Sequence, residues 1–322
     1  MDRSNYGLYL FYNSLFLVNG RPVCKVQPSR GLRQGCPISP YLFLLCVEAL
    51  SCLIMSAEKN GRGLGVRCSR GGLLISHMFF TDDNNLFCRA SRECSSSIQD
   101  ILMVYEFGSG QHINLQNCKI TFSPNVIANT KSVIQNLLGI PAGAKQDQYL
   151  GLHSMMGKNK RVLFNAIKER VWKKLRGWKD SFFSFGGKEM LIKAVAQAIP
   201  SYAMSIFQLP VGLCKDLSAV FSKFWWRSEE GNKKISWVKW VAFCHPKSQD
   251  GLGFKDLLSF NQSLLAKQAW RILSCRHSLV ARLLKAKYFK NGEFLMASAK
   301  NGCSHIWRSI LWGRSLLAKG LR

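Results

Sequence analysis

Acidic residues are scarce in this chain: 18 Asp and Glu stand against 45 Lys and Arg, so the formal net charge is +27. The deficit is uneven, since residues 1–110 hold 11 basic and 8 acidic residues, whereas residues 111–322 hold 34 and 10. Lys and Arg contacts to phosphate supply much of the affinity of proteins for nucleic acid. The charge balance therefore predicts a polyanionic partner for the second part of the chain rather than an ordinary solvated surface.

Long hydrophobic runs are also missing. No stretch reaches about 20 uninterrupted apolar residues, and the longest candidate, Tyr41 to Met55, contains Glu48, which argues against a membrane span. The start of the sequence shows neither a basic leader nor a small-residue cleavage site. We therefore expect an intracellular protein with no membrane partner.

The 12 cysteines form no C-x-x-C pair, and many lie in apolar runs, which is typical of small buried residues in a reducing compartment. Disulfides are not expected. Two C-x-H pairs, Cys275 with His277 and Cys303 with His305, are spaced more tightly than the usual zinc-finger ligands. We interpret these pairs as ordinary residues rather than as a zinc site.

Two adjacent carboxylates mark the one place where the sequence points to a reaction. The segment Phe79 to Asp83 ends an apolar β-type run, and a second apolar run, Leu86 to Cys88, follows it. This pattern predicts a hairpin with Asp82 and Asp83 at its tip. Such carboxylates repel each other unless a cation lies between them, so both are candidate ligands of a divalent metal for phosphoryl chemistry.

Hydrophobic periodicity predicts an α+β first section and a helical second section. In the first section we expect a strand near Leu15 to Val18, a buried helix from about Tyr41 to Lys59, the hairpin, a helix from Ser95 to about Phe107, and short strands near Ile113 to Phe122. In the second section we expect helices over Gly187 to Ile199, Cys214 to Trp226 and Leu264 to Leu284. The change of character places a domain boundary near residues 145 to 160, dividing the chain into 1–150 and 151–322.

A basic amphipathic helix is predicted over Lys158 to Lys179. Its apolar residues recur every three or four positions and mark one buried stripe: Phe164, Ile167, Val171, Leu175 and Trp178. Its cations fall largely off that stripe: Lys160, Arg161, Lys168, Arg170, Lys173, Lys174 and Arg176. Such a helix can pack on a core and present cations to phosphates. A membrane surface or a partner protein stays open as an alternative ligand of this helix.

Aromatic residues of the second section have two interpretations. Trp225, Trp226, Trp237 and Trp240 have the flat rings on which bases stack. Aromatic residues at these spacings more often fill cores. We therefore favour a core role for these four residues.

A series of short motifs runs through nearly the whole chain. They are Gly31-Leu32-Arg33-Gln34-Gly35-Cys36-Pro37-Ile38-Ser39-Pro40, Phe79 to Asp83, Ser109-Gly110-Gln111, Tyr149-Leu150-Gly151, Gly187-Lys188-Glu189, Phe224-Trp225-Trp226, Gly251-Leu252-Gly253-Phe254 and Leu264-Leu265-Ala266-Lys267-Gln268. In their order and rough spacing they resemble the reverse transcriptases of plant LINE-type (non-LTR) retrotransposons. The resemblance implies an RNA-directed DNA polymerase, a nucleotidyltransferase. It also implies a partial right-hand palm, of antiparallel sheet and helices, followed by a helical thumb and a C-terminal extension.

The same resemblance implies roles for particular residues. In that family two divalent ions, held by palm carboxylates, drive primer extension on an RNA template. Asp82 would be the principal ligand and Asp83 would assist, with Mg²⁺ or Mn²⁺ as the ion. Template and incoming nucleotide would contact Arg33, Gln34, Gly35 and Lys119. The primer end would contact Tyr149, Leu150 and Gly151. The duplex would contact Lys168, Arg170, Lys173, Lys174 and Arg176. The implied partners are an RNA template, a DNA primer and deoxynucleoside triphosphates, in the nucleus or cytoplasm.

The match has departures and gaps. Where the family usually has Asp, Ala, Lys and Pro, this chain has Cys36, Thr81, Asn117 and His153. We expect Lys119, on the same face of a strand as Asn117, to compensate for the missing cation. The family places a further metal-binding aspartate upstream of the Gly31 to Pro40 loop, where this sequence has only Asp2, and its fingers also lie upstream.

The main interpretation is therefore a truncated reverse transcriptase element that does not polymerise alone. Two alternatives stay open at this point. One is a non-catalytic nucleic-acid-binding protein derived from such an element, and the other is an active polymerase completed by a separate upstream chain.

Overall fold

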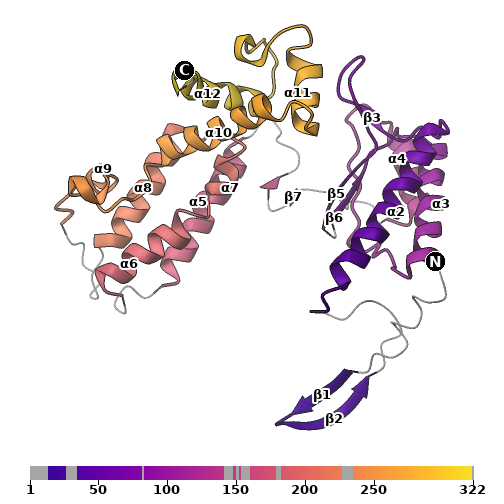
Figure 1. Ribbon diagram of the computed structural model, residues 1–322, viewed down its shortest axis with the longest axis horizontal. Helices are drawn as coiled ribbons and strands as arrows, with labels where there is room; N and C mark the ends of the chain where they lie inside the picture. Colours follow the sequence, from indigo (N-terminus) through magenta and orange to yellow (C-terminus); the bar gives the residue numbers. More distant parts are fainter. Residues whose placement is uncertain are drawn as a thin grey trace. The chain divides into compact units, whose positions relative to one another are not determined.

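A computed structural model describes residues 14–26, 35–81, 83–140, 148–149, 152–153, 160–178, 183–226 and 235–320. The chain divides into two compact units (Figure 1). The first unit comprises Met1–Cys68 and Leu74–Gln146, and the second comprises Ser69–Leu73 and Asp147–Arg322. The sequence predicts a domain boundary near residues 145 to 160. In the structure the first unit ends at Gln146 and the second unit continues from Asp147.

Two helices and a hairpin form the core of the first unit. Helices α2 (Ser39–Lys59) and α3 (Arg92–Ser109) pack together and against the hairpin of β5 (His77–Phe80) and β6 (Asp83–Leu86). The buried residues of this core are Leu50, Ile54, Ala57, Leu64, Ile98, Ile101 and Tyr105. Ser91 caps α3 by accepting the Cys94 N–H at 3.2 Å, so the helix starts before the predicted Ser95.

Short antiparallel hairpins and a third helix complete the first unit. The hairpins pair β1 (Ser14–Val18) with β2 (Arg21–Val26) and β3 (Val66–Arg67) with β4 (Leu74–Ile75). Helix α4 (Ala128–Leu138), which the sequence analysis did not predict, packs against α3. Among the described residues every sheet has two strands, and the α+β class expected from the sequence is confirmed.

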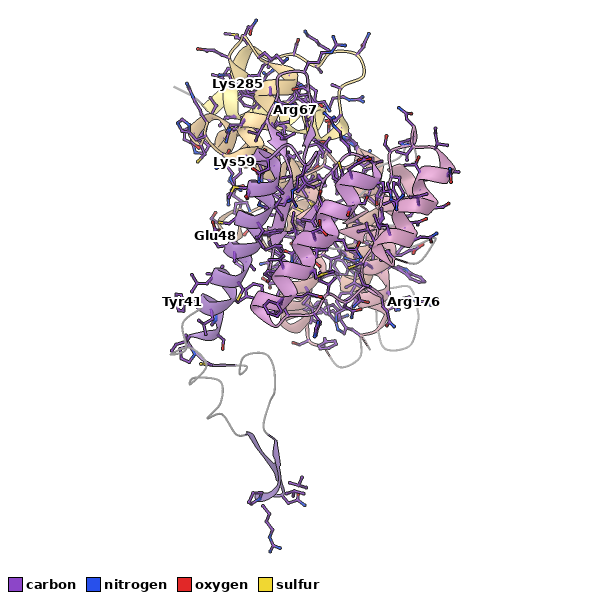
Figure 2. All side chains as sticks on the ribbon, turned by 90° about the vertical axis from the view of Figure 1, so that its right-hand side faces the viewer. Tyr41, Glu48, Lys59, Arg67, Arg176 and Lys285 are labelled. Carbon is purple, nitrogen blue, oxygen red and sulfur yellow. The ribbon has the colours of Figure 1, made fainter. Side chains whose placement is uncertain are left out.

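The expectation that α2 is buried is wrong for its first half. Tyr41, Leu44 and Leu45 are 61 to 70% exposed, and Figure 2 labels Tyr41 near the start of this helix. Burial is confined to Leu50, Ile54 and Ala57, because α3 and the hairpin cover only one stripe of the helix. Among the described helices, α2 is also long and apolar enough to cross a membrane, a test that core helices of soluble proteins pass too.

The short strands predicted near Ile113 to Phe122 are also wrong. This segment is irregular, with a turn at residues 115–117. The Asn114 side chain accepts the backbone N–H groups of Gln116 and Asn117 at 3.1 and 3.3 Å. A side chain that binds its own backbone in this way offers an alternative to strand pairing.

Helices dominate the second unit, as the sequence predicts. The first group comprises α5 (Lys160–Arg176), α6 (Phe185–Leu191), a π-helix (Ile192–Ala196), α7 (Ser201–Met204), α8 (Val211–Trp226) and α9 (Trp240–Phe243). The predicted stripe of α5 is confirmed: Phe164, Ile167, Val171 and Leu175 are buried, and Trp178 packs against them. The core role predicted for the tryptophans is confirmed for Trp225 and Trp240, which are buried, whereas Trp237 is 77% exposed.

The second group is a C-terminal module, defined here as Leu257–Gly320. It contains α10 (Leu257–Ser274), α11 (Leu279–Tyr288), a 3₁₀ turn (Phe294–Met296) and α12 (His305–Gly320), packed around the buried Trp307. The single helix predicted over Leu264 to Leu284 is therefore wrong. Helix α10 ends at Ser274. A new helix then starts after Ser278, whose side chain accepts the Ala281 N–H at 3.4 Å.

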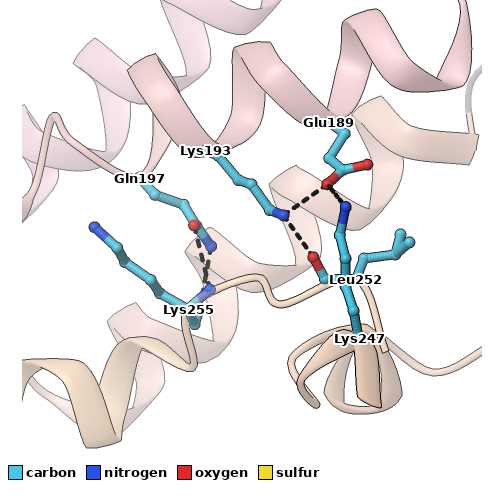
Figure 3. A network of polar contacts seen from close by, with 6 residues as sticks. All are labelled: Glu189, Lys193, Gln197, Lys247, Leu252 and Lys255. Carbon is cyan, nitrogen blue, oxygen red and sulfur yellow. Dashed lines mark hydrogen bonds and ion pairs between the residues drawn. The ribbon is translucent and has the colours of Figure 1, made fainter. Parts of the chain in front are cut away.

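A lysine in the π-helix holds the segment that follows α9 (Figure 3). Lys193 Nζ donates to Glu189 Oε1 at 2.6 Å and to the Leu252 carbonyl at 2.5 Å. The hydrogen bond and charge of Lys193 lower the pKa of the Glu189 carboxyl. One turn on, Gln197 exchanges two hydrogen bonds with the backbone of Lys255. The motifs at residues 187–189 and 251–254 are thus parts of one structural contact.

Candidate metal and nucleic-acid site

The β5–β6 hairpin positions the carboxylates singled out in the sequence. Phe80 pairs with Asp83 and His77 pairs with Leu86, so Thr81 lies at the turn end of the hairpin and Asp83 is the first residue of β6. Thr81 has φ of 51°, the left-handed conformation that tight two-residue hairpin turns require. Asp82 lies outside the described residues.

Alternation along the strands decides which way Asp83 faces. His77, Phe79 and Leu86 are partly buried, and the last two pack against the core of α2 and α3. Met78 and Phe80 are exposed on the opposite face of the hairpin. Asp83 is the cross-strand neighbour of Phe80 and therefore shares the exposed face with it. The carboxylate forms no ion pair with any residue that the structure describes.

The donor chemistry of this turn fits Mg²⁺ or Mn²⁺. These ions prefer carboxylate oxygens, and one or two carboxylates together with substrate phosphates are enough to hold Mg²⁺. No group of three or more His, Cys, Asp or Glu residues that could hold a metal occurs in the described part of the chain. Cys88 follows the end of β6 that is away from the turn, and burial raises the pKa of its thiol to about 11, so this thiol provides no soft ligand beside Asp83. The site therefore suits a hard cation shared with phosphate.

His77, at the base of the same hairpin, was not singled out in the sequence. Its Nε2 lies 3.0 Å from Ser51 Oγ on α2, and its Nδ1 lies 3.1 Å from Ser76 Oγ. Its ring packs on Phe79 with 4.7 Å between centroids. Burial lowers the pKa of His77, and the charges of Glu58 and Glu48 oppose that shift only in part. The histidine thus joins the hairpin to α2 in its neutral form.

The lowered pKa of His77 makes the stability of the first unit depend on pH. The unfolded chain binds this proton near pH 6.5 and the folded chain binds it only at lower pH. The stabilisation is therefore full above pH 6.5 and is lost as the pH falls through the lowered pKa of the folded state. Urea unfolding followed by circular dichroism should show a smaller loss between pH 7.5 and 5.5 in His77→Gln than in the wild type. The exposed His277→Gln is the control, and equal losses in all three proteins would contradict this role.

The other residues predicted to touch nucleotide, template and primer have different outcomes. Gly35 stands before α2 with φ of +83° and open space where a Cβ would lie, whereas Arg33 and Gln34 lie outside the described residues. Lys119 is exposed in the irregular segment, so its expected strand-face relation to Asn117 is wrong. Tyr149 pairs with Leu152 in a hairpin of β7 (Gln148–Tyr149) and β8 (Leu152–His153); Leu150 and Gly151 lie outside the described residues.

The cations of α5 lie largely where the sequence places them. Arg170, Lys173, Lys174 and Arg176 are exposed, and Figure 2 labels Arg176. Lys168 differs, because its Nζ pairs with Asp216 Oδ2 on α8 at 2.7 Å. Lys168 therefore stabilises the contact between α5 and α8. Because its ammonium group is already paired with Asp216, it is less available to bind phosphate.

Sequence reasoning missed Trp172 on this surface. Its side chain is 48% exposed, and the guanidinium of Arg176 lies 4.2 Å from the centre of its ring. Trp172 falls between the buried positions Val171 and Leu175, and this offset from the apolar stripe was the available signal. An exposed indole beside cations can stack on a base while the cations contact phosphate.

Comparison with known sequences agrees with this geometry. Residues 5–154 match the reverse transcriptase (RNA-dependent DNA polymerase) family, and the match includes α2, the β5–β6 hairpin and α3. The first section of the chain is therefore a reverse transcriptase domain.

Relatives in Arabidopsis thaliana extend the comparison. The chain is 49% identical over 125 residues to the uncharacterized mitochondrial protein AtMg00310, covering 38% of this chain and 81% of that protein. It is 34% identical over 163 residues to the putative ribonuclease H protein At1g65750, covering 49% of this chain but only 26% of that protein. It is 51% identical over 80 residues to the uncharacterized mitochondrial protein AtMg01250, covering 25% of this chain and 65% of that protein. Given its extent, the first match shows that the chain belongs to the family of AtMg00310.

Proposed function

We propose that this chain is the reverse transcriptase part of a plant LINE-type retrotransposon, in which Asp82 and Asp83 hold divalent metal ions for nucleotidyl transfer. One observation carries the proposal. The family match spans the β5–β6 hairpin, on which the exposed carboxylate of Asp83 forms no ion pair with a described residue. The proposed ligands are Mg²⁺ or Mn²⁺, an RNA template, a DNA primer and deoxynucleoside triphosphates, and the proposed location is the nucleus or cytoplasm.

The residues of the two units have distinct tasks in this proposal. When bound, the metal ions activate the attacking 3′ hydroxyl and neutralise charge on the triphosphate. Asp83, fixed by its pairing with Phe80, and its neighbour in the sequence, Asp82, would hold the ions. Gly35 leaves room for a nucleotide to approach the backbone, and the exposed cations of α5 contact the phosphates of the bound strands.

Metal binding provides the direct test of this proposal. We expect Asp82→Asn and Asp83→Asn each to weaken Mn²⁺ binding by about tenfold or more, because each variant removes one charged ligand of the ion. Electron paramagnetic resonance of free Mn²⁺ measures this affinity. Asp100→Asn, an exposed carboxylate on α3, is the matched control and should bind as the wild type does. Unchanged Mn²⁺ affinity in both hairpin variants would refute the metal role.

Primer extension on an RNA template gives a second readout. Only two carboxylates are available at the hairpin, and the described residues offer no group of three ligands. We therefore expect the isolated chain to bind Mn²⁺ without extending a primer. Incorporation of nucleotides that disappears in Asp82→Asn would support the metal role and contradict the expected inactivity.

A second candidate function is nucleic-acid binding without catalysis. The exposed cations of α5, with Trp172 under Arg176, favour it specifically. Binding to RNA in EDTA, with an affinity that falls steeply as salt rises, together with no Mn²⁺ binding at the hairpin, would select this function.

A further inference from the structure

The C-terminal module is strongly basic, and it lies outside the residues that match the reverse transcriptase family. Between residues 257 and 320 there are 11 Lys and Arg and one acidic residue, Glu293. The module has its own buried core around Trp307, Ile272 and Phe294, so these cations belong to a folded, packed structure. No ion pair of the described residues involves any of them. Unpaired like charges destabilise a compact module by repulsion, which a polyanionic partner relieves.

Helix α10 gathers three of the relevant side chains on one exposed face. Lys267 precedes Trp270 and Arg271 by three and four residues, a spacing that brings side chains together on a helix surface. All three are exposed, while Leu265, Ala269 and Ile272 on the other side of the helix are buried. Lys267 is therefore a surface neighbour of both Trp270 and Arg271, and the two cations lie on the same side of the indole.

Trp270 is the informative member of this group. Its side chain is 51% exposed, and its ring forms no aromatic or cation–π contact with a described residue. Leaving half of an indole in water gives up much of the stabilisation that burial provides. An exposed indole beside two cations has the composition of a surface that stacks an unpaired base and neutralises neighbouring phosphates.

We propose that this face of α10 binds single-stranded nucleic acid, with Trp270 stacking on a base and Lys267 and Arg271 contacting neighbouring phosphates. The site lies outside residues 5–154 and uses neither the hairpin carboxylates nor a metal ion. Exposed cations on the adjacent α11, Arg282 and Lys285, add to the positive potential of the module; Figure 2 labels Lys285. The chain thus has a nucleic-acid site beyond the one proposed for polymerisation.

The test uses the full chain and a fluorescein-labelled oligouridylate in EDTA, followed by fluorescence anisotropy at several salt concentrations. Trp270→Ala should weaken binding about tenfold and leave the salt dependence unchanged, because a stacked base contributes about 1–3 kcal/mol without releasing counterions. Trp270→Phe should retain most of the affinity. Lys267→Gln with Arg271→Gln should reduce the slope of log K against log salt by about 1.4, because each phosphate that a cation neutralises on a single strand adds about 0.7 to that slope.

Matched controls make the outcome decisive. Lys300→Gln with Lys319→Gln removes the same charge from exposed positions of the module outside α10 and should change the slope clearly less. Equal effects of the two double variants, or full affinity in Trp270→Ala, would overturn the proposal. Tighter binding to anionic lipid vesicles than to the oligonucleotide would also overturn it. EDTA removes any metal ion from the hairpin in this assay, so failure of the hairpin proposal and failure of this one are separate results.

Discussion

Asn261→Ala should lower the free energy of unfolding of the second unit by about 3 kcal/mol or more. Asn261 is fully buried on α10; its Oδ1 accepts the Leu209 N–H at 2.8 Å, and its Nδ2 donates to the carbonyls of Met204 and Phe207 at 2.7 and 2.9 Å. Alanine leaves three backbone groups unsatisfied in the interior, and each costs about 1–3 kcal/mol. One side chain thus holds the turn between α7 and α8.

Tryptophan fluorescence during urea unfolding measures this effect without interference from the first unit. All nine tryptophans lie between residues 172 and 312, within the second unit. The control is Ser263→Ala on the same helix, since Ser263 is exposed and its hydroxyl donates only to the Ser259 carbonyl. We expect that control to lose less than about 0.5 kcal/mol. A loss below about 1 kcal/mol in Asn261→Ala would mean that water reaches the three backbone groups.

Gly313→Ala should produce the second large effect, a loss of about 2–3 kcal/mol or more. Gly313 lies where α12 crosses α10, and a Cβ there would stand 2.3 Å from the Leu265 carbonyl carbon and 2.5 Å from the Ala266 nitrogen. Both are backbone atoms, so no side chain can rotate away to make room. The two helices must separate around the buried Trp307 or the chain must bend.

A glycine with free space around it provides the comparison. Gly212, near the start of α8, has no atom within 4 Å of a Cβ position and no left-handed backbone. Gly212→Ala should therefore be neutral or stabilise the second unit by up to about 1 kcal/mol. Urea unfolding by tryptophan fluorescence measures both variants. Equal stability of the two would mean that α10 and α12 do not pack at the described distance.

Local patterns predicted the parts of the fold that depend on local physics. The stripe of α5 followed from spacing of three and four residues, and the β5–β6 hairpin followed from two apolar runs around a polar turn. Helix ends were less predictable, because side-chain caps decide them. Ser278 divides the predicted single helix in two, and Asn114 replaces the predicted strands with a turn.

Long-range packing could not be read from the sequence. The first half of α2 is as apolar as the second, yet the buried residues of the helix, Leu50, Ile54 and Ala57, all lie in the second. Asn261 resembles any polar helix residue until the chain from Met204 to Leu209 folds against it.

The candidate site shows the same division. The place of Asp83 on a hairpin followed from the two apolar runs around it, and the exposed cations of α5 followed from helical periodicity. The pairing of Lys168 with Asp216 depends on a residue 48 positions away, and the contact of His77 with Ser51 depends on one 26 positions away. The exposure of Trp172 and Trp270 also depends on which neighbouring helices leave these rings uncovered.

The Lys193 contact has a consequence for recombination between genes that encode related chains. Lys193 and Gln197 join the stretch beginning at Gly187 to the stretch ending at Lys255, and helices α7, α8 and α9 lie between the two in the sequence. A recombination breakpoint inside that interval would separate the two stretches. Lys193 would then keep its contact with Glu189 but lose the Leu252 carbonyl, and the backbone near Leu252 would lose its partner. Shuffled copies that still fold are therefore expected to carry both stretches or neither.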